Sequence, residues 1–105
     1  MNKSQAIVDE LLNNKSAIVI TSEGEMTEVS PKDKYFTLEE LYKHINCDII
    51  ECVYLPENKI MIVDEEGMLK KRQLNLLATL IVSHIRKNFV IICGDVVIIN
   101  ENQFE

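Results

Sequence analysis

Apolar and polar residues follow a helical period in some stretches of this chain and a strand-like alternation in others. Apolar residues three and four positions apart predict a leading helix within residues 1–14. A β-branched, apolar run at residues 17–21 and an alternation of polar and apolar residues at 26–29, separated by the turn residues Glu23-Gly24, predict a hairpin. Pro31 ends this unit, because a proline cannot donate a hydrogen bond to a strand ladder.

A second helix and a second hairpin follow. Thr37 and Glu40 have the spacing of a capping box, in which each side chain accepts a hydrogen bond from the other residue's backbone N–H. They predict a helix that begins at Leu38. Residues 48–55 and 59–63 predict two strands joined by a short turn. The second of these strands is apolar on both faces, which indicates a position inside the sheet.

The last helix is predicted at residues 76–87, with Asn75 as its N-cap. Its polar residues form one narrow stripe on an otherwise apolar cylinder, at Thr79, Ser83, Arg86 and Lys87. The core side is expected opposite this stripe, at Leu77, Leu80, Ile81 and Ile85. Two further apolar runs, residues 89–93 and 96–99, are expected to form a terminal strand pair around Gly94-Asp95.

This order of elements predicts an α+β fold. We expect a small, mostly antiparallel sheet built from hairpins, with two or three helices packed on it. A chain of 105 residues is expected to form a single domain over residues 1–105. The leading helix, residues 1–14, is compatible with an addition to a core of residues 17–99.

Composition and charge limit the kinds of protein that this chain can be. With 47% hydrophobic residues, three glycines and two prolines, the chain has the composition of a globular domain. Seventeen acidic and eleven basic residues give a formal net charge of −6, which argues against direct binding to nucleic acid or to an anionic membrane. The three cysteines are an odd number and lie beside or within apolar runs, as expected of a soluble protein of a reducing cytoplasm.

No pattern of catalytic or metal-binding residues stands out. The chain has no Cys-x-x-Cys pair and no two histidines one helical turn apart, so no structural metal site is expected. Its three glycines are widely separated, which excludes a phosphate-cradling loop, and no nucleophile has an identifiable base. The sequence therefore favours a protein that is not an enzyme, and we expect no catalytic residues, cofactor or metal.

Several fold-determining segments resemble a known family. They are Pro31 with Phe36-Thr37-Leu38-Glu39-Glu40-Leu41, Ile50-Glu51 with Leu55, Ile62-Val63-Asp64-Glu65-Glu66-Gly67, Leu74-Asn75 with Ala78, and Gly94-Asp95-Val96. Over about residues 17–99 they resemble a family of small phage and mobile-element proteins described as a domain of unknown function. The resemblance implies an accessory protein of a phage or other mobile element, and it assigns no activity.

We therefore expect a protein-interaction module without catalysis, whose partner is a host or mobile-element protein. Two alternatives are a small-ligand or nucleotide-binding protein, with its pocket between the sheet and the helix that follows Asn75, and an acidic anti-restriction mimic of DNA. Because loops on a rigid scaffold carry function, the predicted binding residues lie in turns. They are Asp64, Glu66, Arg72, Asn75 and Asp95.

Overall fold

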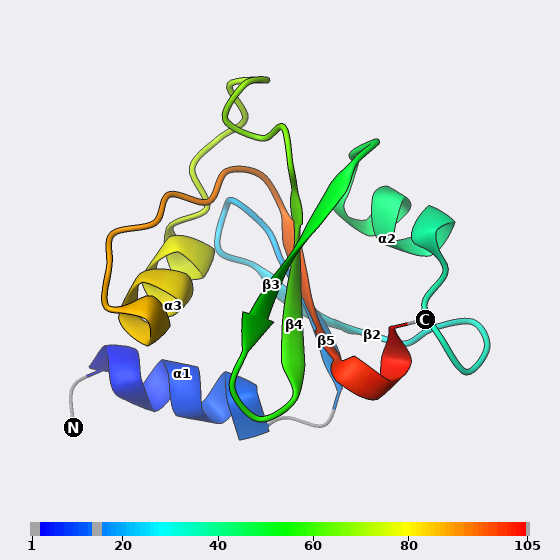
Figure 1. Cartoon of the computed structure of the whole chain (residues 1–105), viewed down its shortest axis with the longest axis horizontal. Helices are drawn as coiled ribbons and strands as arrows, with labels where there is room; N and C mark the ends of the chain where they lie inside the picture. Colours follow the sequence, from blue (N-terminus) through cyan, green and yellow to red (C-terminus); the bar gives the residue numbers. More distant parts are fainter. Residues whose placement is uncertain (1–2, 14–15, 105) are drawn as a thin grey trace.

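The computed structural model describes residues 3–13 and 16–104 of the chain (Figure 1). Its elements are α1 (Lys3–Asn13), β1 (Ala17–Ile20), β2 (Met26–Val29), α2 (Leu38–Ile45), β3 (Ile50–Leu55), β4 (Lys59–Asp64), α3 (Leu76–Arg86), β5 (Val96–Asn100) and the short 3-10 helix η1 (Glu101–Gln103). The predicted leading helix is therefore present as α1. Positions 1, 2 and 14 of that prediction lie outside the described residues.

The five strands form one sheet in the order β2-β1-β5-β4-β3, and all neighbours are antiparallel. Two hairpins, β1–β2 and β3–β4, make up its outer parts. β5 lies between them, so that Val97 pairs with Val19 on one side and with Ile62 on the other. These strands and three helices confirm the predicted α+β fold.

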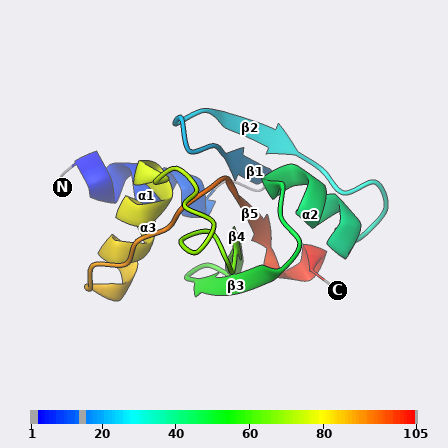
Figure 2. The same cartoon turned by 90° about the horizontal axis from the view of Figure 1, so that it is seen from above.

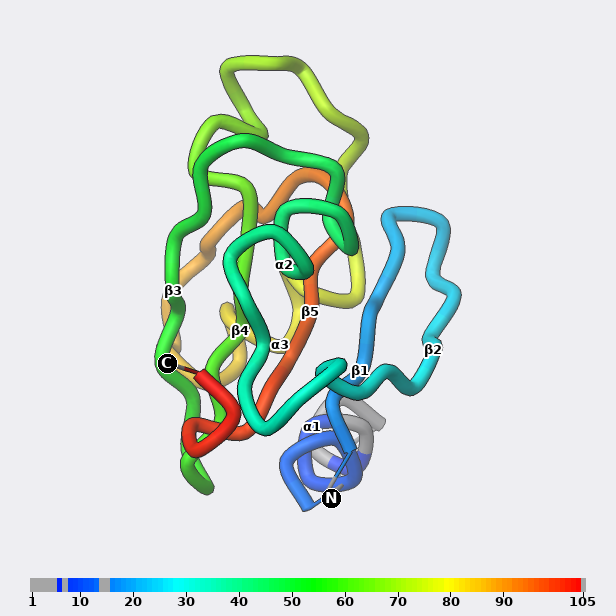
Figure 3. The backbone as a smooth tube through the Cα atoms, turned by 90° about the vertical axis from the view of Figure 1, so that its right-hand side faces the viewer, coloured from blue at the N-terminus to red at the C-terminus, as the bar shows by residue number. Residues whose placement is uncertain are grey.

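The sheet is the middle of three layers. α1 and α3 cover one face and α2 covers the other (Figure 2), where it lies across the middle of the sheet (Figure 3). Each face has its own apolar cluster: Ile20, Met61 and Ile81 belong to the first, and Ile62 and Leu41 to the second. All six residues of β4 are buried, which confirms the interior strand predicted from its two apolar faces.

The capping box that begins α2 is confirmed. Thr37 Oγ1 accepts a hydrogen bond from the backbone N–H of Glu40 at 3.1 Å, and Glu40 Oε1 accepts one from the backbone N–H of Thr37 at 2.9 Å. The bond from Thr37 and a second from the backbone N–H of Lys32 lower the pKa of Glu40. The helix ends at Asn46, which takes the left-handed conformation with φ 53°.

The face assigned to α3 is corrected by the structure. Ile81 is buried, at 1% exposure, and Leu77 and Ile85 pack partly buried against the same cluster. Leu80 is 46% exposed, whereas Thr79, expected on the solvent side, is 2% exposed. The core side of α3 is therefore centred on Ile81 and its neighbours Ala78 and Val82.

The predicted strand at residues 89–93 is also wrong, and the same polar stripe explains why. Thr79 Oγ1 accepts from the N–H of Ile92 at 2.9 Å and donates to its carbonyl at 3.3 Å. Ser83 Oγ makes the same pair of bonds with Val90, at 2.9 and 3.2 Å. Two hydroxyls of α3 thus take the place of a neighbouring strand, and the segment lies along the helix instead of joining the sheet.

Candidate functional site

The predicted binding residues gather at one end of the sheet. Asp64 ends β4, Glu66 and Arg72 lie in the loop between β4 and α3, Asn75 caps α3, and Asp95 precedes β5. This loop is the part of the chain that projects beyond the sheet at the top of Figure 1. The structure therefore brings the five residues to one region, and their contacts show how each is used.

Asp64 is the centre of an ion-pair cluster. Its side chain is 0% exposed, and its Oδ2 lies 3.0 Å from Arg72 Nη1 and 3.4 Å from Lys70 Nζ. Its Oδ1 accepts the backbone N–H of Glu66 at 2.9 Å. Burial alone would raise the pKa of Asp64, but the Glu66 N–H, the Arg72 guanidinium and the Lys70 ammonium together hold the pKa below its ordinary value.

Arg72 links this cluster to two other segments. Its Nη1 donates to the carbonyl oxygens of Ile45, at 2.9 Å, and Asn46, at 3.2 Å, where α2 ends. Arg72 Nε also lies close to Gly94. A Cβ atom at position 94 would be only 2.9 Å from this nitrogen, so the arginine leaves no room there for a side chain. Arg72 thus fastens the loop to α2 and packs against the turn before β5, and its side chain is only 19% exposed.

Asn75 is wholly internal, at 0% exposure. Its Oδ1 accepts the N–H of Ala78 at 3.0 Å and caps α3. Its Nδ2 donates to the carbonyl of Ile20 at 3.0 Å and to that of Gly94 at 2.9 Å. One amide therefore joins the start of α3, the end of β1 and the turn before β5, and it does not line an open pocket.

Asp95 and Glu66 are the more accessible members. Asp95 Oδ1 accepts the backbone N–H of Ser22 at 2.9 Å, which ties the β1–β2 turn to the start of β5. Beside it, a cavity of about 410 Å³ is lined by Asp95, Arg72, Glu23 and Glu25 among others. The Glu66 side chain is 40% exposed and makes only a 3.8 Å contact with Lys70. The Glu66 carboxylate is therefore far more open to solvent than that of Asp64, which is 0% exposed.

A larger cavity lies at the opposite end of the sheet. It has a volume of about 650 Å³ and is lined mainly by polar side chains, including Lys34, Lys59 and Asn100. Lys59 is 4% exposed and its Nζ donates to Asn100 Oδ1. Burial lowers the pKa of Lys59. Sequence reasoning missed this residue because a lysine after a turn is usually a solvated hairpin residue.

Two of the three cysteines, Cys47 and Cys52, lie in surroundings that disfavour the thiolate form. All three are free thiols. Burial, together with the charge of Asp64, raises the pKa of Cys47, and burial together with Glu51 raises that of Cys52. An activated thiol needs a lowered pKa. Within residues 3–13 and 16–104, no group of three or more His, Cys, Asp or Glu side chains could hold a metal ion.

An apolar surface that the sequence did not predict covers the outer side of α3. Of the eleven exposed large hydrophobic side chains among the described residues, seven lie between residues 68 and 91. Leu76 and Leu80 lie one turn apart on α3. In the segment that follows α3, the exposed Phe89 and Ile91 alternate with two residues, Val90 and Ile92, whose backbone groups bond to the helix. We call these side chains the α3 surface: Met68, Leu69, Leu74, Leu76, Leu80, Phe89 and Ile91.

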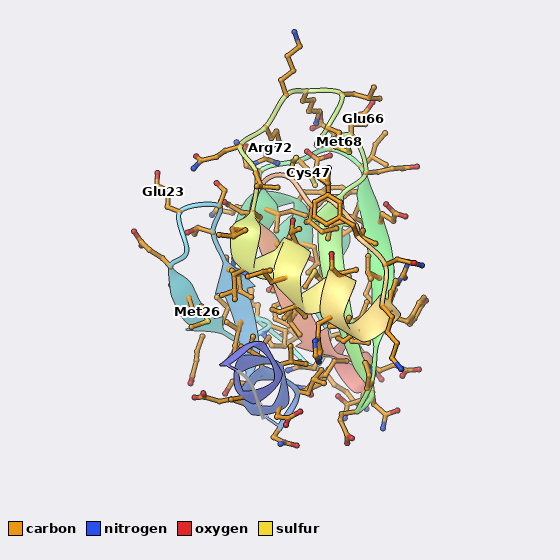
Figure 4. The ribbon with its side chains drawn as sticks, turned by 90° about the vertical axis from the view of Figure 1, so that its left-hand side faces the viewer. Glu23, Met26, Cys47, Glu66, Met68 and Arg72 are labelled. Carbon is orange, nitrogen blue, oxygen red and sulfur yellow. The ribbon has the colours of Figure 1, made fainter. Side chains whose placement is uncertain are left out.

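Figure 4 looks onto α3 and the loop above it, with Met68, Glu66 and Arg72 in that loop. Phe89 is 80% exposed and Leu69 is 82% exposed. The sequence missed this surface because Leu80 was expected in the core and residues 89–93 were expected to pair as a strand. Both errors follow from Thr79 and Ser83, whose hydroxyls turn the polar stripe of α3 inward.

No helix in the described part of the chain has the length and apolar character needed to cross a bilayer.

Comparisons with known proteins give a family and no activity. Neither the curated proteins nor the solved structures give a match. Residues 14–105 match a family described as a domain of unknown function, DUF3846. Because the match extends from just after α1 across the whole sheet, the chain belongs to the DUF3846 family.

Proposed function

We propose that this protein is an interaction module without catalysis that binds another protein through the α3 surface. The observation that carries the proposal is the concentration of exposed Leu, Ile, Met and Phe side chains in α3 and in the segments that precede and follow it. Isolated exposed hydrophobic residues are ordinary, but a group of them marks an interaction site. The partner is expected to cover Leu76, Leu80 and Phe89 with apolar side chains of its own.

The biological setting is part of the same proposal. The sequence resemblance supports an accessory protein of a phage or other mobile element, whose partner is a host or mobile-element protein. The three free thiols support the cytoplasm as its compartment. The acidic anti-restriction mimic of DNA stays a prediction.

The predicted polar residues have a different place in this proposal. Asp64, Arg72 and Asn75 shape the end of the sheet, because their polar atoms bond to other parts of the chain. Glu66 lies at the margin of the α3 surface, since it shares its loop with Met68 and Leu69, whereas Asp95 contacts the β1–β2 turn at Ser22. We expect the polar residues beside the α3 surface to set the orientation of the bound partner, and the apolar side chains of the surface to supply most of the affinity.

The test compares two variants in capture experiments from a host lysate, with proteins quantified by mass spectrometry. Leu80→Ser removes an apolar group of the α3 surface, and Leu38→Ser removes an equally exposed leucine from α2, on the other face of the sheet. Both variants are expected to fold, because both leucines are about half exposed. Partner capture should fall with Leu80→Ser and persist with Leu38→Ser. Equal capture by both variants would contradict the proposal.

A second candidate function has its own observation, the 650 Å³ polar cavity that contains Lys59. It would suit a small, hydrophilic ligand such as a nucleotide. A ligand present at 100 times its dissociation constant should stabilise the fold by about 2.7 kcal/mol. A thermal-shift screen with nucleotides and inorganic phosphate tests this candidate, and the absence of any shift would remove it.

A further inference from the structure

The charges of this acidic protein are separated along the chain. Residues 67–94 contain five of the eleven basic residues and no aspartate or glutamate. That stretch has a formal charge of +5. The remainder, with six basic and seventeen acidic residues, has a formal charge of −11. The basic stretch includes α3 and every member of the α3 surface, so the exposed apolar side chains lie in the one long part of the sequence without a carboxylate.

Three of the five cations are available to a partner. Lys70 and Arg72 are engaged with Asp64. Lys71, Arg86 and Lys87 are exposed, and none of them forms a salt bridge with another described residue. Lys71 lies in the loop before α3, and Arg86 and Lys87 mark its end. Since an α-helix of eleven residues is about 16 Å long, the exposed cations flank the apolar side chains from both ends of the helix.

We propose that the α3 surface receives an acidic segment of another protein, which lies along α3. Its apolar side chains cover Leu76, Leu80 and Phe89, and its carboxylates meet Lys71 at one end and Arg86 at the other. This inference rests on the proposed function and adds the chemistry of the partner. Complementary charge at the margin of an apolar contact fixes orientation and speeds association.

Other occupants fit this surface less well. A second copy related by a two-fold axis would bring the same cations of both protomers to one interface. A head-to-tail contact with the acidic remainder would not stop at a dimer, because it continues into a ring or an open filament. Nucleic acid and anionic membranes need many phosphate contacts. Three exposed cations on a molecule of net charge −6 are few for that purpose. An acidic peptide segment needs only a small number of ion pairs beside the apolar contact.

Selection of random peptides displayed on phage, against the wild-type protein at low ionic strength, tests the inference directly. We expect the enriched peptides to combine aspartate or glutamate with leucine, isoleucine or phenylalanine. Their binding should weaken with rising salt and with Leu80→Ser. Enrichment of neutral or basic peptides, or no enrichment at all, would overturn the inference.

A matched pair of double variants isolates the contribution of charge. Lys71→Gln with Arg86→Gln removes one cation from a loop and one from the last turn of α3. Lys32→Gln with Lys43→Gln removes one from a loop and one from the last turn of α2. Both double variants change the formal net charge from −6 to −8. The first should weaken binding of a selected peptide about fivefold at low salt and the second less than about twofold.

Equal weakening by the two double variants would overturn the inference, because only the global charge would then matter. This failure is distinct from failure of the proposed function. If Leu80→Ser abolishes lysate capture while the Lys71 and Arg86 substitutions change nothing, the α3 surface is an interface without acidic preference. If Leu80→Ser leaves the amount of partner captured from the lysate unchanged, the proposed function fails, whichever peptides are selected.

Discussion

Replacing Asn75 with alanine should cost about 3 kcal/mol of folding stability without changing the α3 surface. The Oδ1 bond to the N–H of Ala78 is an N-cap, worth about 1 kcal/mol. The Nδ2 bonds to the carbonyls of Ile20 and Gly94 are buried and contribute about 1 kcal/mol each. For a domain of this size, a loss of about 3 kcal/mol corresponds to a melting temperature lower by about 12–24 °C.

Urea unfolding followed by circular dichroism measures this loss, and Asn75→Asp separates its parts. The aspartate keeps an oxygen for the cap of α3, but it places a second oxygen opposite the carbonyls of Ile20 and Gly94. At pH 7 it should therefore destabilise the fold at least as much as alanine. A loss below about 1 kcal/mol for Asn75→Ala would refute the reasoning. It would show that the amide does not hold the three segments together.

Three further predictions follow from burial and charge. Ile81→Ala should cost about 2–5 kcal/mol in the same unfolding assay, while Leu80→Ala should cost less than about 1 kcal/mol because Leu80 is half exposed; similar losses would mean that the face of α3 is wrongly placed. The lowered pKa of Asp64 stabilises the fold above the unfolded-state pKa of about 4, and this contribution is lost as the pH falls through the folded-state value. The stability difference between wild type and Asp64→Asn should therefore shrink between pH 7 and pH 3, and a constant difference would argue against the ion-pair cluster. Alkylation of the denatured, unreduced protein should add a label to each of the three cysteines, and a single label would reveal a disulfide.

Local signals in the sequence were sufficient for most elements. The capping box of Thr37 and Glu40 places the start of α2 because both halves of the motif lie within four residues. The apolar run of residues 60–63 indicates the interior position of β4, because it puts apolar side chains on both faces of the strand. In these cases the information lies within one element, so the pattern predicts the structure.

The remaining features depend on contacts between distant segments. Residues 89–93 have the composition of a strand, but the hydroxyls of Thr79 and Ser83 occupy their hydrogen-bonding groups. The predicted site shows the same limit. Its members lie in turns, as predicted, but spacing could not reveal that Arg72 reaches back to Ile45 or that Asn75 reaches Ile20. The α3 surface was missed for the same reason.

The position of β5 has a consequence for how the protein is made. β5 follows the other four strands in sequence, yet it is the strand between the two hairpins. During synthesis each hairpin can form as soon as its own residues emerge from the ribosome, but the two cannot join into one sheet until residues 96–100 are free. Until then the backbone N–H and C=O groups with which β1 and β4 pair to β5 stay open to other strands. A nascent chain stalled before Val96 is therefore expected to hold two separate hairpins and to be a target for chaperones, whereas the release of residues 96–100 lets the two hairpins join into one sheet.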